Sequence, residues 1–378
     1  MSVKSFGHKG ACIKVIGVGG AGGNAVEHMI KKGIDNVEFY TANTDTQALQ
    51  SSKAKVIQLG KELTKGLGSG ADPSVGAQAA QEAKEDICAA LEGADMVFIT
   101  AGMGGGTGTG AAPVIAEFAK EMGILTVAVV TKPFRFEGFK RQELADGGLE
   151  KLVNFTDSLI LVPNDKLISV LGKSASLLGA FEKANGILEG AIRGTTDLIT
   201  RPGLINVDFA DVRTVMSEMG VSMMGSGTGR GEGRAREAAV AALKSPLLEY
   251  VDLSGAKGVL VNVTAGCDLS IGEFEIVGQT IRDITSDQAH VVIGTVIDDS
   301  AHESLTVTVI ATGLEQGHQE EPAPKKQAEP LVNRARSSFS TQQVTKPVES
   351  EKKEAKKESG DLMDIPAFLR RRDTEEAF

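Results

Sequence analysis

Residues 101–110, with the sequence AGMGGGTGTG, constrain the fold more than any other part of this chain. Glycine has no β-carbon, so a turn this rich in glycine can point its backbone N–H groups inward and let a phosphate approach closely. An apolar run, Met96–Ile99, precedes it, and a helix-compatible run, Ala111–Lys120, follows with its own unpaired N–H groups. Thr107 and Thr109 add hydroxyl donors. The alternative is a flexible linker, but a strand and a helix rarely bracket a linker, so the pattern predicts a phosphate site.

Short β-branched runs alternate with helix-compatible segments through the first half of the chain. The expected strands are 13–18, 37–40, 96–100, 125–130 and 159–162, and the expected helices between them include 24–32, 75–91 and 111–122. This alternation predicts a Rossmann-like α/β fold around a parallel sheet. Apolar residues spaced three and four apart from Phe181 to Leu198 predict one long helix over residues 180–200, which Pro202 and Gly203 would end.

A second, smaller α/β region follows the long helix, with apolar runs at 259–264, 291–297 and 305–310. From residue 315 to 360 Glu, Lys, Gln, Pro and Ser dominate, so we expect a disordered linker. Apolar residues return at helical spacing in Asp361–Arg372, which suits docking into a partner's groove or packing on the chain's own domain. The expected divisions are therefore 1–179, 180–200, 201–314, 315–360 and 361–378.

Composition excludes several classes of protein. No apolar run approaches the roughly 20 residues that a membrane-spanning helix needs, and the first ten residues lack an apolar signal region. Three scattered cysteines argue against a disulfide framework or a zinc cluster, and we expect all three to be buried. The net charge is −10, of which residues 315–378 carry only −1, so the acidic body disfavours nucleic-acid binding. A cytoplasmic location is expected.

A second glycine-rich turn, Gly17–Gly22, fits the GxGxxG pattern of dinucleotide-binding folds. An NAD-dependent oxidoreductase of doubly wound fold is therefore the alternative function, with Asp45 as a late candidate for the ribose contact. Two phosphate-type turns at neighbouring strand ends suit a nucleoside triphosphate better. The P-loop pattern is absent, because Leu167 stands where the first glycine before Gly172-Lys173-Ser174 is required.

Two further segments leave alternatives open. Residues 66–73 form a third glycine-rich stretch, which is either an ordinary flexible turn or a segment that orders when a terminal phosphate is present. Asp208 and Asp211, three residues apart, would share a face of a helix. Their spacing alone favours a helix cap at Asp208 with Asp211 one turn on, and the alternative is a pair that polarises an attacking water.

Taken together, these motifs resemble the FtsZ family of bacterial cell-division GTPases in the tubulin superfamily. Residues 104–110 are similar to the tubulin signature GGGTGTG, which is highly specific. Residues 16–24, 43–45, 132–134, 201–203, 206–214 and 364–369 also resemble this family, so the likeness spans nearly the whole chain except 315–360.

The resemblance implies a set of residues that bind GTP or GDP. The phosphates would lie against Gly19, Gly20, Ala21, Gly22, Gly23, Asn24, Gly104, Gly105, Gly106, Thr107, Gly108 and Thr109. Asn43 and Ala71 would also contact the nucleotide. Glu137 and Arg141 would contact the ribose side, Phe181 would stack on guanine, and Asn185 would hydrogen-bond its edge. Many family members carry Asp at the Asn185 position, which forms charge-assisted bonds that Asn cannot. Ala21 is tolerable within the glycine run if its φ is negative.

The resemblance also implies a mechanism that needs two chains. Asn206, Asp208 and Asp211 would lie on the face opposite the nucleotide and complete the site of the next subunit in a head-to-tail filament, which favours catalysis over capping. Mg²⁺ would accompany the GTP. The peptide Asp361–Arg372 would bind membrane-tethering and regulatory division proteins, and the protein would act at the mid-cell division site.

Overall fold

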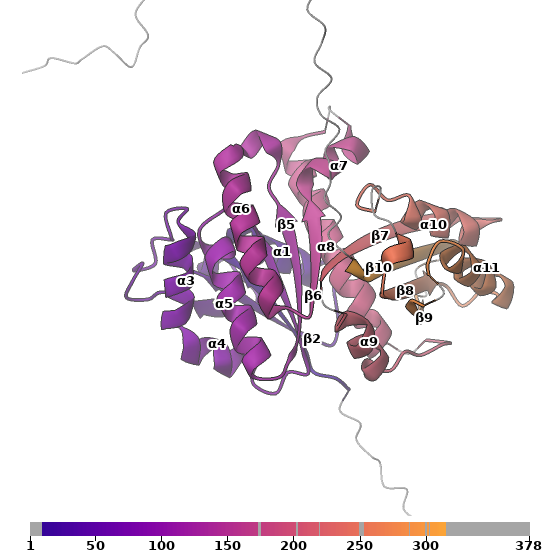
Figure 1. The fold of residues 1–378 in the computed structure, drawn as a ribbon, viewed down its shortest axis with the longest axis horizontal. Coiled ribbons are helices and arrows are strands. Elements are labelled where there is room, and N and C mark those ends of the chain that lie inside the picture. Colours follow the sequence, from indigo (N-terminus) through magenta and orange to yellow (C-terminus); the bar gives the residue numbers. More distant parts are fainter. Residues whose placement is uncertain are drawn as a thin grey trace, which may run out of the picture. The chain divides into compact units, whose positions relative to one another are not determined.

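Strands and helices alternate through the first half of the chain, as the sequence predicts (Figure 1). The computed structural model describes residues 10–314 except 173, 174, 202, 219, 249–252, 287, 299, 300 and 302. The expected linker 315–360 and peptide 361–378 lie outside the described residues.

In this half the strands are β1 (Ile13–Val18), β2 (Val37–Asn43), β3 (Lys55–Gln58), β4 (Met96–Gly102), β5 (Leu125–Lys132) and β6 (Ser158–Pro163). The α-helices are α1 (Gly19–Lys31), α2 (Thr46–Gln50), α3 (Pro73–Glu82), α4 (Lys84–Leu91), α5 (Thr107–Glu121), α6 (Phe139–Leu152) and α7 (Asn164–Leu171), with short 3₁₀ turns η1 (Arg135–Glu137) and η2 (Val153–Phe155). The single helix expected over 75–91 is two helices that meet at Ala83.

The second half begins with the predicted long helix, α8 (Leu177–Thr200). The elements that follow are α9 (Phe209–Met216), β7 (Val221–Arg230), α10 (Arg234–Leu243), η3 (Leu253–Gly255), β8 (Gly258–Ala265), α11 (Ile271–Arg282), β9 (His290–Ile297) and β10 (Ser304–Leu314). Strand β7, like β3 in the first half, is not among the strands that the sequence predicts.

The described strands form one mixed sheet in the order β3-β2-β1-β4-β5-β6-β7-β10-β8-β9. Strands β1 to β6 are parallel, so their carboxyl ends meet at one edge. The chain moves outward in opposite directions from the adjacent strands β1 and β4, and this reversal of order is where open α/β sheets bind ligands. The two α/β regions share this sheet, because β6 pairs in parallel with β7 through Leu159–Val221 and Ile160–Ser222.

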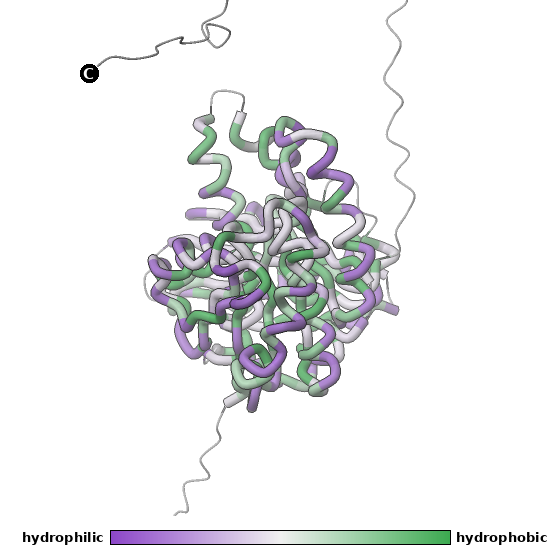
Figure 2. The backbone as a smooth tube through the Cα atoms, turned by 90° about the vertical axis from the view of Figure 1, so that its left-hand side faces the viewer, coloured by the Kyte–Doolittle hydropathy of each residue, from purple (hydrophilic) through white to green (hydrophobic). Residues whose placement is uncertain are grey.

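Helices cover both faces of the parallel part, and each face has its own apolar core. One core joins the strands to α3, α4, α5 and α6, and the other joins them to α1 and α8 (Figure 1). The apolar strands β1, β4 and β5 are therefore almost fully buried, as continuous apolar runs predict. Hydrophobic stretches run through the middle of the molecule in Figure 2, with strongly hydrophilic stretches on the outside.

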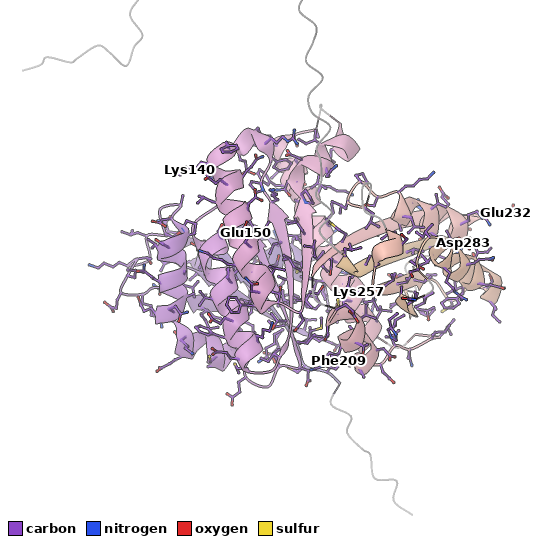
Figure 3. The ribbon with its side chains drawn as sticks, in the orientation of Figure 1. Lys140, Glu150, Phe209, Glu232, Lys257 and Asp283 are labelled. Atoms are coloured by element: carbon purple, nitrogen blue, oxygen red, sulfur yellow. The ribbon has the colours of Figure 1, made fainter. Side chains whose placement is uncertain are left out.

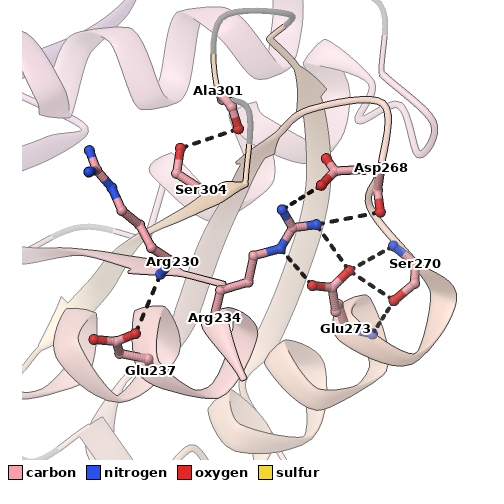
Figure 4. Close-up of polar contacts among 8 residues, drawn as sticks. All are labelled: Arg230, Arg234, Glu237, Asp268, Ser270, Glu273, Ala301 and Ser304. Atoms are coloured by element: carbon pink, nitrogen blue, oxygen red, sulfur yellow. Dashed lines mark hydrogen bonds and ion pairs between the residues drawn. The ribbon is translucent and has the colours of Figure 1, made fainter. Parts of the chain in front are cut away.

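In the second half a buried arginine ties α10 to α11 (Figure 4). Arg234 donates from Nη1 to Asp268 Oδ2 at 2.7 Å and from Nε to Glu273 Oε1 at 2.6 Å. Glu273 also accepts from the backbone N–H and hydroxyl of Ser270, which caps α11. The Arg234 guanidinium lowers the pKa of Glu273 from 4.5 to about 2 and also lowers the pKa of Asp268. This arrangement stays ionised at neutral pH and fixes the two helices together.

Two expectations from composition have different outcomes. Among the described helices, none combines the length and the apolar character needed to cross a membrane. The prediction that all three cysteines are buried is wrong: Cys267 is exposed, and Cys12 and Cys88 are only partly buried. Each lies near the end of a strand or on a helix surface, where a small side chain is not forced into the core.

Candidate functional site

The two glycine-rich turns meet at the carboxyl ends of neighbouring strands. Helix α1 starts at Gly19, directly after β1, and α5 starts at Thr107, five residues after β4. A β-carbon on Gly19, whose φ is +73°, would lie 3.0 Å from the amide nitrogen of Gly108. The two helix starts therefore touch, and only glycine permits this approach together with this backbone conformation.

Neither helix start is neutralised by its own capping residue or its own first turn. Val18 and Gly106, which precede α1 and α5, form no side-chain capping bond, and no acidic residue lies in the first turn of either helix. The unpaired N–H groups and the positive ends of both helix dipoles therefore face the same place. This arrangement favours a polyphosphate, as the glycine pattern predicts.

The rest of the predicted α1 segment lies along the first turn of the helix. Gly20, Ala21 and Asn24 are exposed, whereas Gly22 is buried and Gly23 is half-buried. Ala21 does not have a positive φ, so its methyl group is tolerated within the glycine run, as the sequence analysis requires. Asn43 ends β2 beside β1, and its side chain is buried with Oδ1 accepting from the N–H of Asp45.

Thr107 and Thr109 do not stand free as hydroxyl donors. Thr109 Oγ1 accepts the N–H of Gly104 at 2.8 Å and so braces the turn from within. Thr107 Oγ1 lies 2.7 Å from Thr44 Oγ1 and 3.0 Å from Ser69 Oγ. Both threonines are buried, so they hold the glycine turn in shape as well as lining it.

The third glycine-rich stretch packs directly on the second. A β-carbon on Gly106 would lie 2.3 Å from Ser69 Oγ and 3.0 Å from the carbonyl carbon of Ala71. Ala71 has a φ of +61° and is exposed. Residues 66–73 thus form the wall of the candidate site beside the α5 start.

The opposite wall comes from η1 and α6. Gly104, with a φ of +100°, lies against the backbone of Arg141: a β-carbon there would be 2.7 Å from the Arg141 carbonyl oxygen. Arg141 Nη1 donates to Glu137 Oε2 at 2.7 Å, and Glu137 Oε1 accepts the N–H of Phe134. Glu137 and Arg141 therefore form one unit beside the glycine turn, and Gly105 between the two walls has open space around it.

Aromatic rings continue from this wall to α8. Phe134 is fully buried and stacks on Phe136 with centroids 4.8 Å apart, and Phe181 meets Phe134 edge-on at 5.5 Å. Phe181 is 39% exposed, so part of its ring is free for a base. Asn185 lies one helical turn further along α8 and is half-buried, and α8 packs against α1.

Sequence reasoning missed Asn164, which follows β6 at the same sheet edge. Its side chain is buried, and its Oδ1 has no hydrogen-bond partner among the described residues. The neighbouring Asp165 pairs with Arg135 of η1, so Asn164 lies close to the aromatic wall. A buried amide oxygen without a partner indicates a missing one. A single Asn forms no recognisable motif. Its position directly after a predicted strand is the one sequence signal that could have indicated it.

Asn206, Asp208 and Asp211 lie at the other end of α8 (Figure 3, in which Phe209 marks this end and Lys140 the end with the glycine turns). Arg201 is 20 positions beyond Phe181, and at 1.5 Å per residue this distance is about 30 Å along the helix. Asn206 Oδ1 accepts the N–H of Gly203, which fixes the turn after α8. Asp208 occupies the N-cap position of α9, yet its side chain forms no capping bond. The predicted positions, with Asp208 as the N-cap and Asp211 in the first turn, are therefore confirmed without a side-chain bond, and the structure does not bring these three residues to the predicted nucleotide residues of the same chain.

Comparison with known proteins agrees with this geometry. Residues 12–172 match the model of the Tubulin/FtsZ family, GTPase domain, and residues 220–315 match that of the FtsZ family, C-terminal domain. The match gives no support to the nicotinamide-dependent alternative, since the first glycine turn belongs to a GTPase domain.

Individual relatives cover almost the whole chain. The cell division protein FtsZ of Coxiella burnetii is 59% identical over 373 residues, 96% of each chain, and that of Pseudomonas aeruginosa is 63% identical over 80% of this chain and 77% of the relative. The solved FtsZ dimer of M. jannaschii superposes with a TM-score of 0.77 at 45% identity and covers 80% of this chain and 88% of that one. The chain therefore belongs to the FtsZ family of cell-division GTPases, which shares its GTPase domain with the tubulins.

Proposed function

We propose that this protein hydrolyses GTP at the junction between consecutive subunits of a head-to-tail filament, each site being built by two chains. The observation that carries the proposal is the separation of the two half-sites by the length of α8. A nucleotide held at Phe181 is about 30 Å from the α9 end of its own chain. A second copy stacked end to end would bring the missing half.

The first half-site binds the nucleotide. The starts of α1 and α5 hold the phosphates with backbone N–H groups, and the unit of Glu137 and Arg141 lies beside the ribose. Guanine stacks on Phe181, with Asn185 and Asn164 offering polar groups to its edge. Backbone donors aimed at the phosphates stabilise the charge that develops as the terminal phosphoryl group leaves.

Mg²⁺ fits this site as a companion of the phosphates. Within the described residues no group of three His, Cys, Asp or Glu side chains could hold a metal by itself. Mg²⁺ keeps several waters and is commonly bound through substrate phosphates, so a donor set without a carboxylate cage suits it. It would neutralise charge on the phosphate oxygens.

The second half-site activates water. Neither Asp208 nor Asp211 pairs with a described cation, and both are exposed near the start of α9. Two free carboxylates can orient and polarise a water that attacks the terminal phosphate of the neighbour's GTP. Asn206 supports them by holding the preceding turn and by offering its amide group.

Apolar side chains at both ends support the stacking of subunits. Leu67, Phe136, Phe139, Leu177 and Leu178 are exposed around the nucleotide end, and Leu204 and Ile205 are exposed beside Asn206. Exposed apolar groups of this size mark contact surfaces. Because the two ends differ, the contact is heterologous and continues into a filament. The solved M. jannaschii relative is itself described as a dimer.

The remaining proposals concern the cell. By family, the filament would act in the cytoplasm at the mid-cell division site, and the peptide Asp361–Arg372, outside the described residues, would bind membrane-tethering and regulatory division proteins.

A mixing experiment tests the two-chain site. Asp211→Ala removes a carboxylate and leaves the nucleotide pocket intact. Gly20→Glu places a negative charge in the phosphate turn, where a side chain meets open space, so it blocks the nucleotide without disturbing the fold. Each variant alone should release little phosphate from GTP. Their mixture should recover activity, because GTP in one variant meets Asp211 of the other.

Recovery must depend on both partners. A mixture of Asp211→Ala with Asp208→Ala, which damage the same half-site, should stay as inactive as either variant. If the first mixture is no more active than the sum of its parts although both variants are folded, the two-chain site is wrong.

A further inference from the structure

Three buried hydroxyl groups form a chain beneath the start of α5. Thr44 Oγ1 lies 2.7 Å from Thr107 Oγ1, which lies 3.0 Å from Ser69 Oγ. Thr44 is completely buried, and Thr107 and Ser69 are 8% and 9% exposed. Each comes from a different segment: the residue after β2, the first residue of α5, and the stretch 66–73. The chain of hydroxyls therefore connects the phosphate turn to the wall beside it.

The stretch 66–73 does not depend on these hydroxyls for its position. The N–H of Gly68 donates to the carbonyl oxygen of Thr44 at 3.1 Å, and the N–H of Thr46 donates to that of Gly66 at 3.1 Å. The missing side chain of Gly106 leaves the space that Ser69 Oγ occupies. Removing one hydroxyl thus leaves the backbone attachment in place.

Counting protons shows what the hydroxyl chain can do. Each hydroxyl has one proton to donate and two lone pairs to accept with. Two hydrogen bonds consume two of the three protons. Thr107 keeps its own proton only when both Thr44 and Ser69 donate to it. In the other two arrangements Thr107 donates to one neighbour and has nothing to offer a ligand.

We propose that a phosphate bound at Thr107 orders this hydroxyl chain, so that Thr44 and Ser69 are positioning residues that prepare Thr107 and tie residues 66–73 to the occupied site. An anionic oxygen accepts the Thr107 proton and selects the one arrangement in which both neighbours donate. Hydrogen bonds in such a chain polarise and strengthen one another. The inference rests on the proposed GTP site.

The terminal phosphate is the one that Thr107 would meet. The base end of the site lies at Phe181 on α8, which packs against α1. Phe181 meets Phe134 next to η1, whereas Thr107 lies within hydrogen-bond distance of Ser69 in the opposite wall. A nucleotide with its base at Phe181 therefore extends its phosphates toward Thr107 and Ser69. The hydroxyl chain therefore distinguishes a triphosphate from a diphosphate.

Binding of GDP and of a non-hydrolysable GTP analogue to protein diluted below assembly tests this role. Thr44→Val and Ser69→Ala each remove one donor at nearly constant shape. The affinity for the analogue should fall about fivefold, the size expected for one hydrogen bond, and the affinity for GDP should change less than about twofold. Thr44→Ser, which keeps the hydroxyl, should restore the wild-type ratio. Thr126→Val is the matched control, since Thr126 is a buried strand threonine whose hydroxyl donates to Ile124 at the amino end of β5.

The outcomes separate the two proposals. If the wild type binds neither nucleotide, the GTP site fails and the hydroxyl chain fails with it. If the wild type binds both but Thr44→Val and Ser69→Ala change neither affinity, only the positioning role is wrong. An equal loss for GDP and the analogue also overturns it, because that result indicates a general structural role.

Discussion

The β-carbon that Gly19 lacks would lie 3.0 Å from the amide nitrogen of Gly108, so the two glycine turns of this GTPase are in direct contact. Residues 89 positions apart in the chain thereby meet, as the adjacency of β1 and β4 requires. The glycines of the second turn are not equivalent, however, and the difference can be measured.

Gly108→Ala should destabilise the fold, whereas Gly105→Ala should not. A β-carbon on Gly108 would lie 2.7 Å from the carbonyl oxygen of Gly102, but one on Gly105 meets nothing within 4 Å. Overpacking against backbone costs about 1–3 kcal/mol, partly offset by the helix preference of alanine. Urea unfolding of both variants checks this. Equal stability of the two would show that the turn adjusts freely.

Asp211→Ala should bind GTP as the wild type does, assemble, and hydrolyse GTP about 100-fold more slowly, the usual effect of losing a group that assists proton transfer. Nucleotide affinity, sedimentation and phosphate release measure the three properties. Asp283→Ala is the control, since Asp283 is an exposed carboxylate on the far end of α11 (Figure 3). Loss of GTP binding in a folded Asp211→Ala protein would instead indicate that Asp211 supports the fold.

GTP turnover per chain should rise steeply with protein concentration, because each complete site needs two molecules. Below the assembly range the rate per chain should approach zero, and above it the rate should level off. Phosphate release over a dilution series, with light scattering to follow assembly, is the measurement. A rate per chain that stays constant on dilution would mean that a single molecule is competent.

Asn185→Asp should sharpen the choice of base. A carboxylate accepts charge-assisted hydrogen bonds from the two N–H groups on the guanine edge, and such bonds are roughly twice as strong as neutral ones. The affinity for GTP relative to ATP should increase about fivefold. Competition binding measures this ratio. The new negative charge repels the phosphates of GTP and ATP equally, so this repulsion does not affect the ratio. Glu182→Gln, a charge change at a neighbouring exposed position of α8, should leave the ratio unchanged.

Glu273→Gln should lower the free energy of unfolding at pH 7 by about 2 kcal/mol. The pKa of Glu273 is lowered from 4.5 to about 2 in the folded state by Arg234, so the stabilisation is complete above pH 4.5 and is lost as the pH falls toward 2. The gap between wild type and variant in urea unfolding should therefore narrow from pH 7 to pH 3. Glu275→Gln, at an exposed position of the same helix, is the control. A gap that does not depend on pH would contradict the ion-pair explanation.

The sequence predicted most of the alternating half of the fold, because β1, β4 and β5 are buried on both faces and so appear as unbroken apolar runs. The short strand β3, in which only one of four residues is buried, was missed. Strand β7 escaped prediction because Gly225, Gly227 and Gly229 occupy alternate positions, and glycine disfavours strands. The cause is tertiary: a β-carbon on Gly227 would lie 2.3 Å from the amide nitrogen of Ala242, since α10 rests directly on this strand. No local pattern predicts such a contact.

In the candidate site, too, some residues were predictable from local sequence and others only from tertiary contacts. The glycine turns predict a phosphate site because so high a glycine content in a turn is rare. The role of Phe181 as the residue that stacks on the base was predicted only from the family resemblance. Asn164 and the hydroxyls of Thr44 and Ser69 are ordinary residues whose importance arises only from burial and proximity. The spacing of Asp208 and Asp211 correctly predicted the start of α9, with Asp208 at the N-cap and Asp211 in the first turn, but it could not show that the Asp208 side chain makes no capping bond.

The placement of the pocket and of Asp211 at opposite ends of α8 gives the proposed filament a direction. One terminus would end in an uncovered nucleotide and the other in unmatched acidic groups. A filament would contain one fewer complete catalytic site than it has subunits. The GTP at the uncovered end would be hydrolysed last, because no neighbouring subunit completes its site. Proteins that recognise a polymer tip would then have two chemically distinct targets, one rich in phosphate and one rich in carboxylate.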